Sequence, residues 1–429
     1  MKTTKNLLLI VIITLVFTGC QEKITDTYMV NMPVYMDRQS FKKSVKVTDK
    51  QDIAEPGKIY FKDNYVFINE ALKGIHIINN INPADPVFVS FISIPGNMDM
   101  AIKDSILFAD SFTDLVALDI SDIMNIRETG RVDSIFPYSL PPLTEQNQFP
   151  FGMVDATKGI VVGWETKMVE EVIETGQSTF PVMERWNLMS ENTTFTKFND
   201  SGSGSPSMSV GVGGSLARFT IHSSFLYTVD QYNLRTFDID DLTRPLLISD
   251  LGIGWDVETV FLYQNKLFFG TQTGMLIYDI SIPSSPKYIS SYSHFKSCDP
   301  VVVEGNFAYV TLRAGTLCGE ATSQLDVINV SNITEPKWEK SYPMHEPYGL
   351  GIDNKTLFIC DGEAGLKVYD ATQPKSLLEI AGFPDVNAYD VIPFNGVLMM
   401  IGKDGLYQYD YSGPASMNLL SYIPIQKKD

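Results

Sequence analysis

Charged residues and tyrosines recur where short apolar runs begin, at positions spread along the chain. They are Asp99, Asp256, Asp299 and Asp390, with Lys58 and Arg218 at equivalent places and Tyr348 and Tyr389 in the same connecting segments. Converging carboxylate oxygens suit Ca²⁺ or a polar ligand, and tyrosine rings add flat apolar surface. The simpler interpretation is that solvated aspartates start strands beside turns. The choice depends on the elements that position these residues.

Other chemistry is weakly represented. The chain shows no glycine-rich phosphate loop that opens a helix, no serine nucleophile elbow and no pair of carboxylates spaced for glycoside hydrolysis. Its four histidines lie far apart in the sequence, without the spacing of paired metal ligands. We therefore expect no catalytic residues and no cofactor, with Ca²⁺ as the cation that the aspartates would suit. The metal, if there is one, stays unknown.

Composition limits the class of protein. The chain has 429 residues, 44% of them hydrophobic, which indicates a globular protein rather than a disordered one. Its net charge of −18 argues against a nucleic-acid partner, because phosphate binding needs clustered lysine and arginine. Four cysteines in this length argue against a disulfide-dense scaffold.

One six-residue phrase, mostly apolar in its middle and closed by Asp or Asn, recurs along the chain, in most cases at steps near forty residues. Its copies are Gly74–Asn79, Asp114–Asp119, Asn233–Asp238, Gly274–Asp279, Gln324–Asn329, Gly365–Asp370 and Gly405–Asp410. Two short alternating runs joined by a tight turn precede most copies, and a turn, often marked by proline, and a fourth run follow. We expect the closing Asp or Asn to bond the backbone two residues on and start that turn.

Four short strands in about forty residues, with no helical periodicity between them, predict small antiparallel sheets stacked around an axis. The expected fold is all-β, a β-propeller of four-stranded blades. Eight blades are expected if residues of about 136–214 form one enlarged blade whose surface loops include Ser201–Gly214. Seven blades, with part of this interval outside the ring, is the alternative. We also expect both ends of the chain to share one sheet, with Met417–Ile423 pairing with the N-terminal region.

The phrases resemble the LVIVD repeat, a β-propeller family common in lipoproteins and secreted proteins of Bacteroidetes-like bacteria. The resemblance covers roughly residues 57–429 and is strongest over Asp299–Asp370, in Leu312–Cys318 and Cys360–Asp370. It implies the fold, and the family offers no established catalytic set to carry over. The stretch 136–214 departs from the pattern.

The N-terminus has the features of an export signal. Lys2 and Lys5 precede a short apolar run, and Phe17–Cys20 resembles the bacterial lipobox, whose cysteine is acylated. We therefore expect a signal peptide over residues 1–19, an acyl chain such as palmitate on Cys20, a polar tether over 20–51 and a propeller over 52–429. The expected location is the outer membrane, facing the periplasm or the exterior. Ordinary signal cleavage nearby is the alternative.

Export places the cysteines in an oxidising compartment. Cys298 precedes a predicted hairpin and Cys318 follows it, so a disulfide between them would pin the loop that lengthens this repeat. Cys360, inside an apolar run, is expected to stay a buried free thiol. Two unpaired thiols at positions 298 and 318 are the alternative.

Three functions remain in view. The first is a non-enzymatic binding or scaffold protein, held at the membrane by its lipid, that uses one face of the ring for a protein or glycan partner. The second is a metal-assisted hydrolase or lactonase-like enzyme. It would use the aspartates at the strand starts, which we expect at the mouth of the central channel of the ring. A purely structural role in the envelope is the third. The absence of a recognisable catalytic constellation favours the first.

Overall fold

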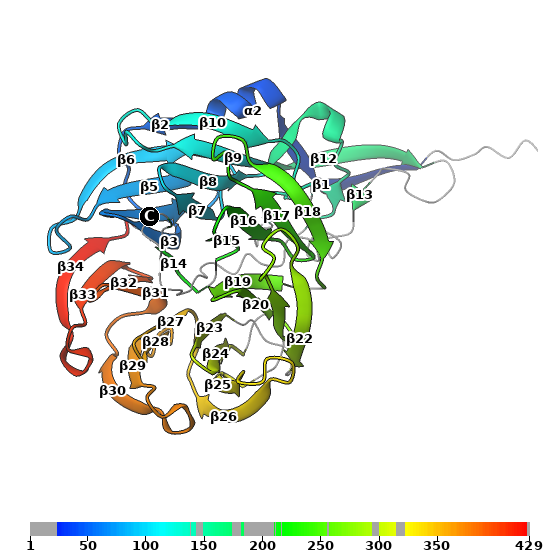
Figure 1. Cartoon of the computed structure of the whole chain (residues 1–429). Helices are drawn as coiled ribbons and strands as arrows, with labels where there is room; N and C mark the ends of the chain where they lie inside the picture. Colours follow the sequence, from blue (N-terminus) through cyan, green and yellow to red (C-terminus); the bar gives the residue numbers. More distant parts are fainter. Residues whose placement is uncertain are drawn as a thin grey trace, which may run out of the picture.

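The computed structural model describes residues 24–137, 139–142, 149–173, 182–183, 210, 212–215, 217–254, 257–293, 300–314 and 322–426. Strands dominate these residues, as expected for an all-β protein, and they form eight sheets. Seven of the sheets, numbered 1 to 7 here, are built on four consecutive antiparallel strands, and sheet 1 has six strands because β2 (Lys46–Thr48) and β14 (Val212–Gly213) add to its edges. Figure 1 shows these seven arranged around a central axis.

Sheets 1 to 3 hold the first half of the ring. Sheet 1 contains β3 (Pro56–Lys62), β4 (Tyr65–Glu70), β5 (Gly74–Asn79) and β6 (Val87–Ser93). Sheet 2 contains β7 (Met100–Lys103), β8 (Ile106–Ser111), β9 (Asp114–Asp119) and β10 (Arg127–Val132). Sheet 3 contains β15 (Phe219–His222), β16 (Phe225–Val229), β17 (Asn233–Asp238) and β18 (Leu246–Gly252).

Sheets 4 to 7 complete the ring. Sheet 4 contains β19 (Val257–Tyr263), β20 (Lys266–Thr271), β21 (Gly274–Asp279) and β22 (Lys287–Ser293). Sheet 5 contains β23 (Val301–Glu304), β24 (Phe307–Leu312), β25 (Gln324–Asn329) and β26 (Lys337–Pro343). Sheet 6 contains β27 (Leu350–Asp353), β28 (Thr356–Cys360), β29 (Leu366–Asp370) and β30 (Leu378–Phe383). Sheet 7 contains β31 (Ala388–Phe394), β32 (Val397–Gly402), β33 (Gly405–Asp410) and β34 (Asn418–Pro424).

The recurring phrase is the third strand of each of these sheets. Its apolar middle is buried because this strand lies between the second and fourth strands and is covered by neighbouring sheets. Its closing Asp or Asn accepts a hydrogen bond from the backbone N–H two residues on in all seven sheets, at 2.8–3.3 Å. The expected turn-starting role is therefore confirmed.

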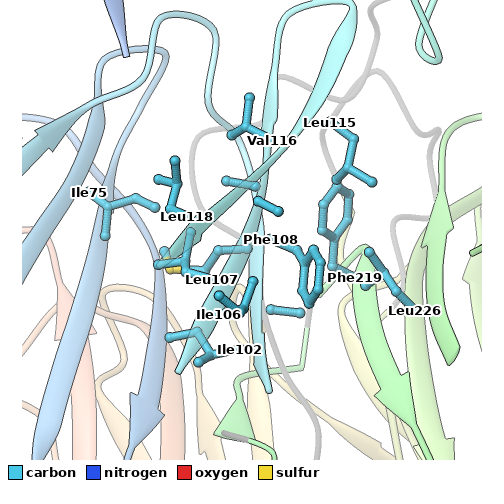
Figure 2. Close-up of a cluster of buried hydrophobic side chains, with 14 of the residues drawn as sticks. Ile75, Ile102, Ile106, Leu107, Phe108, Leu115, Val116, Leu118, Phe219 and Leu226 are labelled. Carbon is cyan, nitrogen blue, oxygen red and sulfur yellow. The ribbon is translucent and has the colours of Figure 1, made fainter. Parts of the chain in front are cut away.

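The core lies between the sheets. Ile75 of sheet 1 contributes to the same buried cluster as Phe108 and Leu118 of sheet 2 and Phe219 of sheet 3. Figure 2 shows these side chains between the blue, cyan and green strands. Sheet 2 therefore packs directly on sheets 1 and 3, and each small sheet buries both faces in this way.

The eighth sheet, called the accessory sheet here, is built differently. It contains β1 (Ile24–Met36), β11 (Phe151–Gly152), β12 (Ile160–Ile173) and β13 (Val182–Met183), in the order β12-β1-β11-β13. β1 pairs antiparallel with β12 from Ile24↔Ile173 to Met36↔Ile160, and parallel with β11. The total of eight sheets agrees with the expected number of units, but the eighth is not an enlarged blade drawn from 136–214, because half of its long pairing comes from the N-terminus.

Two further expectations need correction. Residues 24–44, expected within the polar tether, instead form β1 and the helix α2 (Arg38–Ser44), whereas the strand expected around residues 44–48 is present as β2 (Lys46–Thr48), which pairs with β6. The two chain ends do not share a sheet, because β34 pairs with β33 alone among the described strands. Sheets 7 and 1 instead meet through side chains, such as the rings of Phe61 and Phe394 at 5.0 Å.

The short helices are η1 (Ala156–Lys158), η2 (Pro374–Ser376) and η3 (Pro414–Ser416). Within the described part of the chain, no helix is both long enough and apolar enough to cross a membrane.

Candidate functional site

The antiparallel order of sheets 1 to 7 places equivalent strand ends at the same end of the ring. The first strands, β3, β7, β15, β19, β23, β27 and β31, lie innermost and begin at the end that we call the channel mouth. Second strands end there and third strands begin there. Residues far apart in the sequence therefore meet at the mouth, as the sequence predicted.

Asp99 and Arg218 are brought together with Lys58 where sheets 1, 2 and 3 meet. The ammonium of Lys58 lies 2.7 Å from Asp99 Oδ2, and both side chains are buried. The same oxygen accepts hydrogen bonds from the backbone N–H groups of Arg218 and Phe219, and Oδ1 accepts one from Met100. Four donors thus occupy this carboxylate, which joins three sheets.

A second carboxylate, that of Asp110, binds the loop that carries Asp99. Asp110 Oδ1 accepts hydrogen bonds from the backbone N–H groups of Met98 and Asp99 at 2.8 and 2.9 Å and from the amide of Asn97 at 2.9 Å. Burial nevertheless raises the pKa of Asp110 to about 6. The arrangement fixes the loop before β7 and is the kind of satisfied polar network that specifies packing.

Tyr348, Tyr389 and Asp390 are brought together on the opposite side of the mouth, between sheets 6 and 7. The two tyrosine rings meet edge to face with centroids 5.0 Å apart. Arg313, which follows β24 of sheet 5, places its guanidinium carbon 4.1 Å from the centroid of the Tyr348 ring. We call Arg313, Glu346, Tyr348 and Tyr389 the tyrosine–arginine cluster.

Hydrogen bonds to backbone groups, partly from side chains, hold this cluster in place across three sheets. Thr311 Oγ1 donates to the carbonyl of Tyr348 at 2.7 Å, and the N–H of Gly349 donates to the carbonyl of Tyr389 at 2.8 Å. Asp361, fully buried, accepts from the N–H groups of His345 and Glu346 and pairs with Lys367. The loop that carries Tyr348 is therefore fixed rather than free to rearrange.

Acidic groups surround the cluster. The phenol of Tyr348 donates to Glu346 Oε1 at 2.9 Å. Burial and this hydrogen bond outweigh the opposing charge of Arg313 and raise the pKa of Tyr348 to about 12. The pKa of Tyr389 is also raised, by burial and by the carboxylates of Glu346, Asp404 and Glu363. Both phenols are therefore neutral donors at physiological pH, beside negative charge.

Asp390 itself is not exposed to the mouth. Its side chain is 1% exposed and lies against the backbone of Gly349, where a Cβ would come within 2.4 Å of Asp390 Oδ1. Glycine at position 349 is thus what allows this approach. Asp390 contributes to the packing beneath the tyrosines, whereas Tyr348 and Tyr389 stay half-exposed.

The end of the 136–214 interval enters the ring instead of forming only surface loops. β14 (Val212–Gly213) pairs with β3 of sheet 1. Two residues on, buried Ser215 accepts a hydrogen bond at its Oγ from the N–H of Leu350 in sheet 6, at 2.9 Å. This segment thus crosses between sheets on different sides of the ring, which corrects the expectation for its residues 212–214.

The remaining predicted residues are not placed. Cys20, Asp256, Cys298, Asp299 and Cys318 lie outside the described residues. Cys360 is described, and it is a buried free cysteine as expected. Among the residues that the structure describes, no group of three or more His, Cys, Asp or Glu side chains is arranged to hold a metal ion.

Sequence reasoning missed Arg313, Glu346 and Ser215. Arg313 and Glu346 lie in loops that join strands, and their approach to Tyr348 depends on the neighbouring sheets. A signal for Arg313 was its position directly after the second strand of a repeat, which the topology places at the mouth. Nothing local marks Ser215, because its partner lies 135 residues away.

A hollow lies at the end of sheets 1 and 2 that is opposite the channel mouth. It has a volume of about 660 Å³ and is lined by the turns after β3, β7 and β9, including Lys62, Asp63, Asp104 and Met124. The ammonium of Lys62 lies 2.5 Å from Asp63 Oδ2. No motif in the sequence pointed to this hollow.

Comparisons with known proteins agree with the repeat. The family model of the LVIVD repeat matches residues 256–294 and 296–343, which correspond to sheets 4 and 5. These matches support the LVIVD-repeat β-propeller expected from the recurring phrase. No curated protein matches the sequence significantly.

Solved structures share the fold. They include the computationally designed Ika8 protein, at 11% identity and a TM-score of 0.50, with 89% of this chain and 95% of that chain covered. A functionally unknown protein from Desulfotomaculum acetoxidans DSM 771 has 11% identity and a TM-score of 0.51, with 84% and 95% covered. A Lactobacillus plantarum protein has 9% identity and a TM-score of 0.50, with 87% and 97% covered.

Proposed function

We propose that this β-propeller is a non-enzymatic binding module, anchored to the outer membrane through an acyl chain on Cys20, that binds a protein or glycan partner at its channel mouth. The observation that carries the proposal is the tyrosine–arginine cluster, in which two partly exposed tyrosines are held rigidly by three sheets, with the buried Arg313 packed against the Tyr348 ring. Tyrosine and arginine are the residues that most often dominate binding energy at protein interfaces.

Between the two classes of partner, a protein with a basic surface is favoured. The guanidinium of Arg313 lies over the Tyr348 ring, where a sugar would have to stack. The carboxylates of Glu346, Glu363 and Asp404 act on Tyr389, and the whole chain carries a charge of −18. Such a field attracts lysine and arginine and accelerates association with a basic partner.

Photo-cross-linking in intact cells tests the binding site. A photoreactive phenylalanine at position 389 should capture a discrete protein partner, which mass spectrometry then identifies. The control is position 288, because Tyr288 is a tyrosine that is more exposed than Tyr389 but lies on β22, the outermost strand of sheet 4. Equal capture from positions 389 and 288 would contradict the proposal.

A glycan array probed with residues 21–429 covers the other partner class. Binding that is lost in Tyr389→Ala and kept in Tyr288→Ala would assign the cluster to a glycan. Stoichiometric metal in the purified protein, measured by mass spectrometry, would instead favour the metal-assisted hydrolase.

Metabolic labelling tests the anchor. A fatty acid analogue should label the native chain and fail to label Cys20→Ala, because acylation requires the thiol. Equal labelling of the two proteins would remove the lipid anchor from the proposal.

A further inference from the structure

The chain distance between Cys20 and the folded protein is short. β1 begins at Ile24, so three residues separate it from Cys20. Extended chain spans at most about 3.6 Å per residue, which limits the distance from Cys20 to Ile24 to about 14 Å. A lipid on Cys20 would therefore hold the start of β1 close to the membrane surface.

The first half of β1 and the second half of β12 form a two-stranded ribbon that stands off the ring. Successive side chains of a strand point to opposite faces; on one face of the ribbon Glu170 is exposed, and on the other Tyr28 and Val169 are partly exposed. Met168 is 67% exposed, and Thr25 and Thr27 on β1 are exposed too. One face of this part is therefore exposed and the other is partly exposed, and Figure 1 shows it projecting from the body beside α2.

The other end of the ribbon is fixed to sheet 2 through α2. Phe41 of α2 is fully buried against Phe112 and Ile160, and Met36 at the end of β1 packs against the same cluster. The guanidinium of Arg131 lies over the Phe41 ring at 5.5 Å. Asp37 caps the helix by accepting from the N–H groups of Gln39 and Ser40.

Polar contacts add to this attachment. Lys42 pairs with Asp133 at 2.7 Å, and Arg38 donates to Ser134 Oγ at 2.6 Å. Both partners follow directly after β10, the outermost strand of sheet 2. An apolar contact flanked by polar ones restricts rotation of the ribbon about its base, so the ribbon and the ring move as one unit.

From these three observations we infer that the β1–β12 ribbon is a rigid stalk that holds the ring away from a lipid surface. The inference rests on the proposed anchor at Cys20. It adds a defined spacing between the ring and the membrane, which the anchor alone does not provide. Six residue pairs, Ile24↔Ile173 to Met29↔Met168, at about 3.3 Å per residue give a stalk of roughly 20 Å.

Neutron reflectometry on a supported bilayer tests the stalk. A six-histidine tag placed directly before Gln21 attaches the chain to nickel-chelating lipid, and a matched protein carries the tag after Asp429. For the protein with the N-terminal tag, we expect a layer of low protein density between the bilayer and the ring. The C-terminal tag should leave the ring closer to the bilayer, because β34 ends within the ring at Pro424.

A shortened ribbon gives the second comparison. Deleting residues 25–28 together with 169–172 removes four facing pairs and keeps every other side chain on its face, because the number is even. The layer of low protein density should become thinner by up to about 13 Å, at about 3.3 Å per pair. Circular dichroism and the melting temperature should stay unchanged, since the exposed part of the ribbon supports no core.

The outcomes separate the stalk from the anchor. Equal spacing for the N-terminal and C-terminal tags, or spacing unaffected by the deletion, would overturn the stalk. Since the tag replaces the lipid, neither result depends on acylation of Cys20, which fatty-acid labelling decides independently.

Discussion

At the scale of single residues, the same side chain performs different tasks in this protein according to its neighbours. Aspartates that close the third strands bond their own backbone two residues on, and this local role was predictable from the sequence. Asp99 binds partners 41 and 119 residues away, and its donors come from two neighbouring sheets. The position of Asp99 at the start of a strand therefore predicted that it lies at the mouth. It did not predict that hydrogen-bond donors already occupy its carboxylate.

Glu70 offers a test of such a network through pH. Burial would raise the pKa of this carboxyl, but hydrogen bonds from His76, the N–H groups of Ala54 and Glu55, and Lys73 outweigh it and hold the pKa at about 2. The unfolded value is about 4.3, so the charged form stabilises the fold above that pH and the stabilisation is lost as pH falls toward 2.

Glu70→Gln should therefore lower the free energy of unfolding by about 1–3 kcal/mol at pH 7, and the difference from the native chain should shrink below pH 4. Urea unfolding at a series of pH values measures this. Glu55→Gln is the control, because the Glu55 side chain is 57% exposed. A deficit of Glu70→Gln that is the same at pH 7 and pH 3 would argue against the assigned role.

At the scale of elements, alternating apolar runs and tight turns predicted the strands of sheets 1 to 7 correctly, and Asp63, Gly305 and Asn395 in those turns adopt positive φ. The accessory sheet was not predictable in this way. β1 lies in a segment read as a polar tether, and its partner β12 is more than a hundred residues away. Pairing between distant segments leaves no local periodicity to read.

The hairpin of β23 and β24 carries a prediction that concerns its loops. A disulfide between Cys298 and Cys318, both outside the described residues, would leave Cys360 as the one free thiol among these three. Burial raises the pKa of the Cys360 thiol, so it should react only after unfolding.

Thiol titration of the mature chain, unreduced, should therefore find none of these three cysteines in the native state and one after denaturation. Three reactive thiols among residues 298, 318 and 360 in the denatured protein would refute the disulfide. Cys360→Ser is the control, and it should reduce the denatured count to zero.

At the scale of the whole molecule, the ends of the ring are joined by side chains rather than by a shared sheet. The amides of Asn80 and Gln408 exchange two hydrogen bonds at 2.8 Å between sheets 1 and 7, and both residues are buried. Ser421 Oγ donates to the carbonyl of Pro83 at 2.6 Å. The repeat predicted a ring. How its first and last sheets are joined could not be predicted, because the side chains that join them lie more than three hundred residues apart in the sequence.

Gln408→Ala should cost about 1–3 kcal/mol of unfolding free energy, because it leaves the buried amide of Asn80 without its partner. Asn80→Ala should have a similar cost, and the double variant should cost clearly less than the sum of the two. Chemical unfolding of all four proteins gives the coupling. Additive costs would show that this pair does not join the sheets.

The account as a whole depends on the mouth of the ring being a binding surface. The position of the two tyrosines at this surface was predictable, because strand order places them there, whereas the burial of Asp390 beneath them and the approach of Arg313 and Glu346 depend on the packing of three sheets. Charge reversal by Glu363→Lys, at an exposed position, should slow association with a basic partner and leave folding unchanged.

The most direct test is the affinity of residues 21–429 for the partner captured from position 389, compared among the native chain, Tyr389→Ala and Tyr288→Ala. We predict that Tyr389→Ala weakens binding by about thirtyfold, equivalent to the roughly 2 kcal/mol of an interface hot spot, while Tyr288→Ala binds as the native chain does. Thermal unfolding of each variant confirms that the ring is intact. An unchanged affinity in a folded Tyr389→Ala variant would contradict the account.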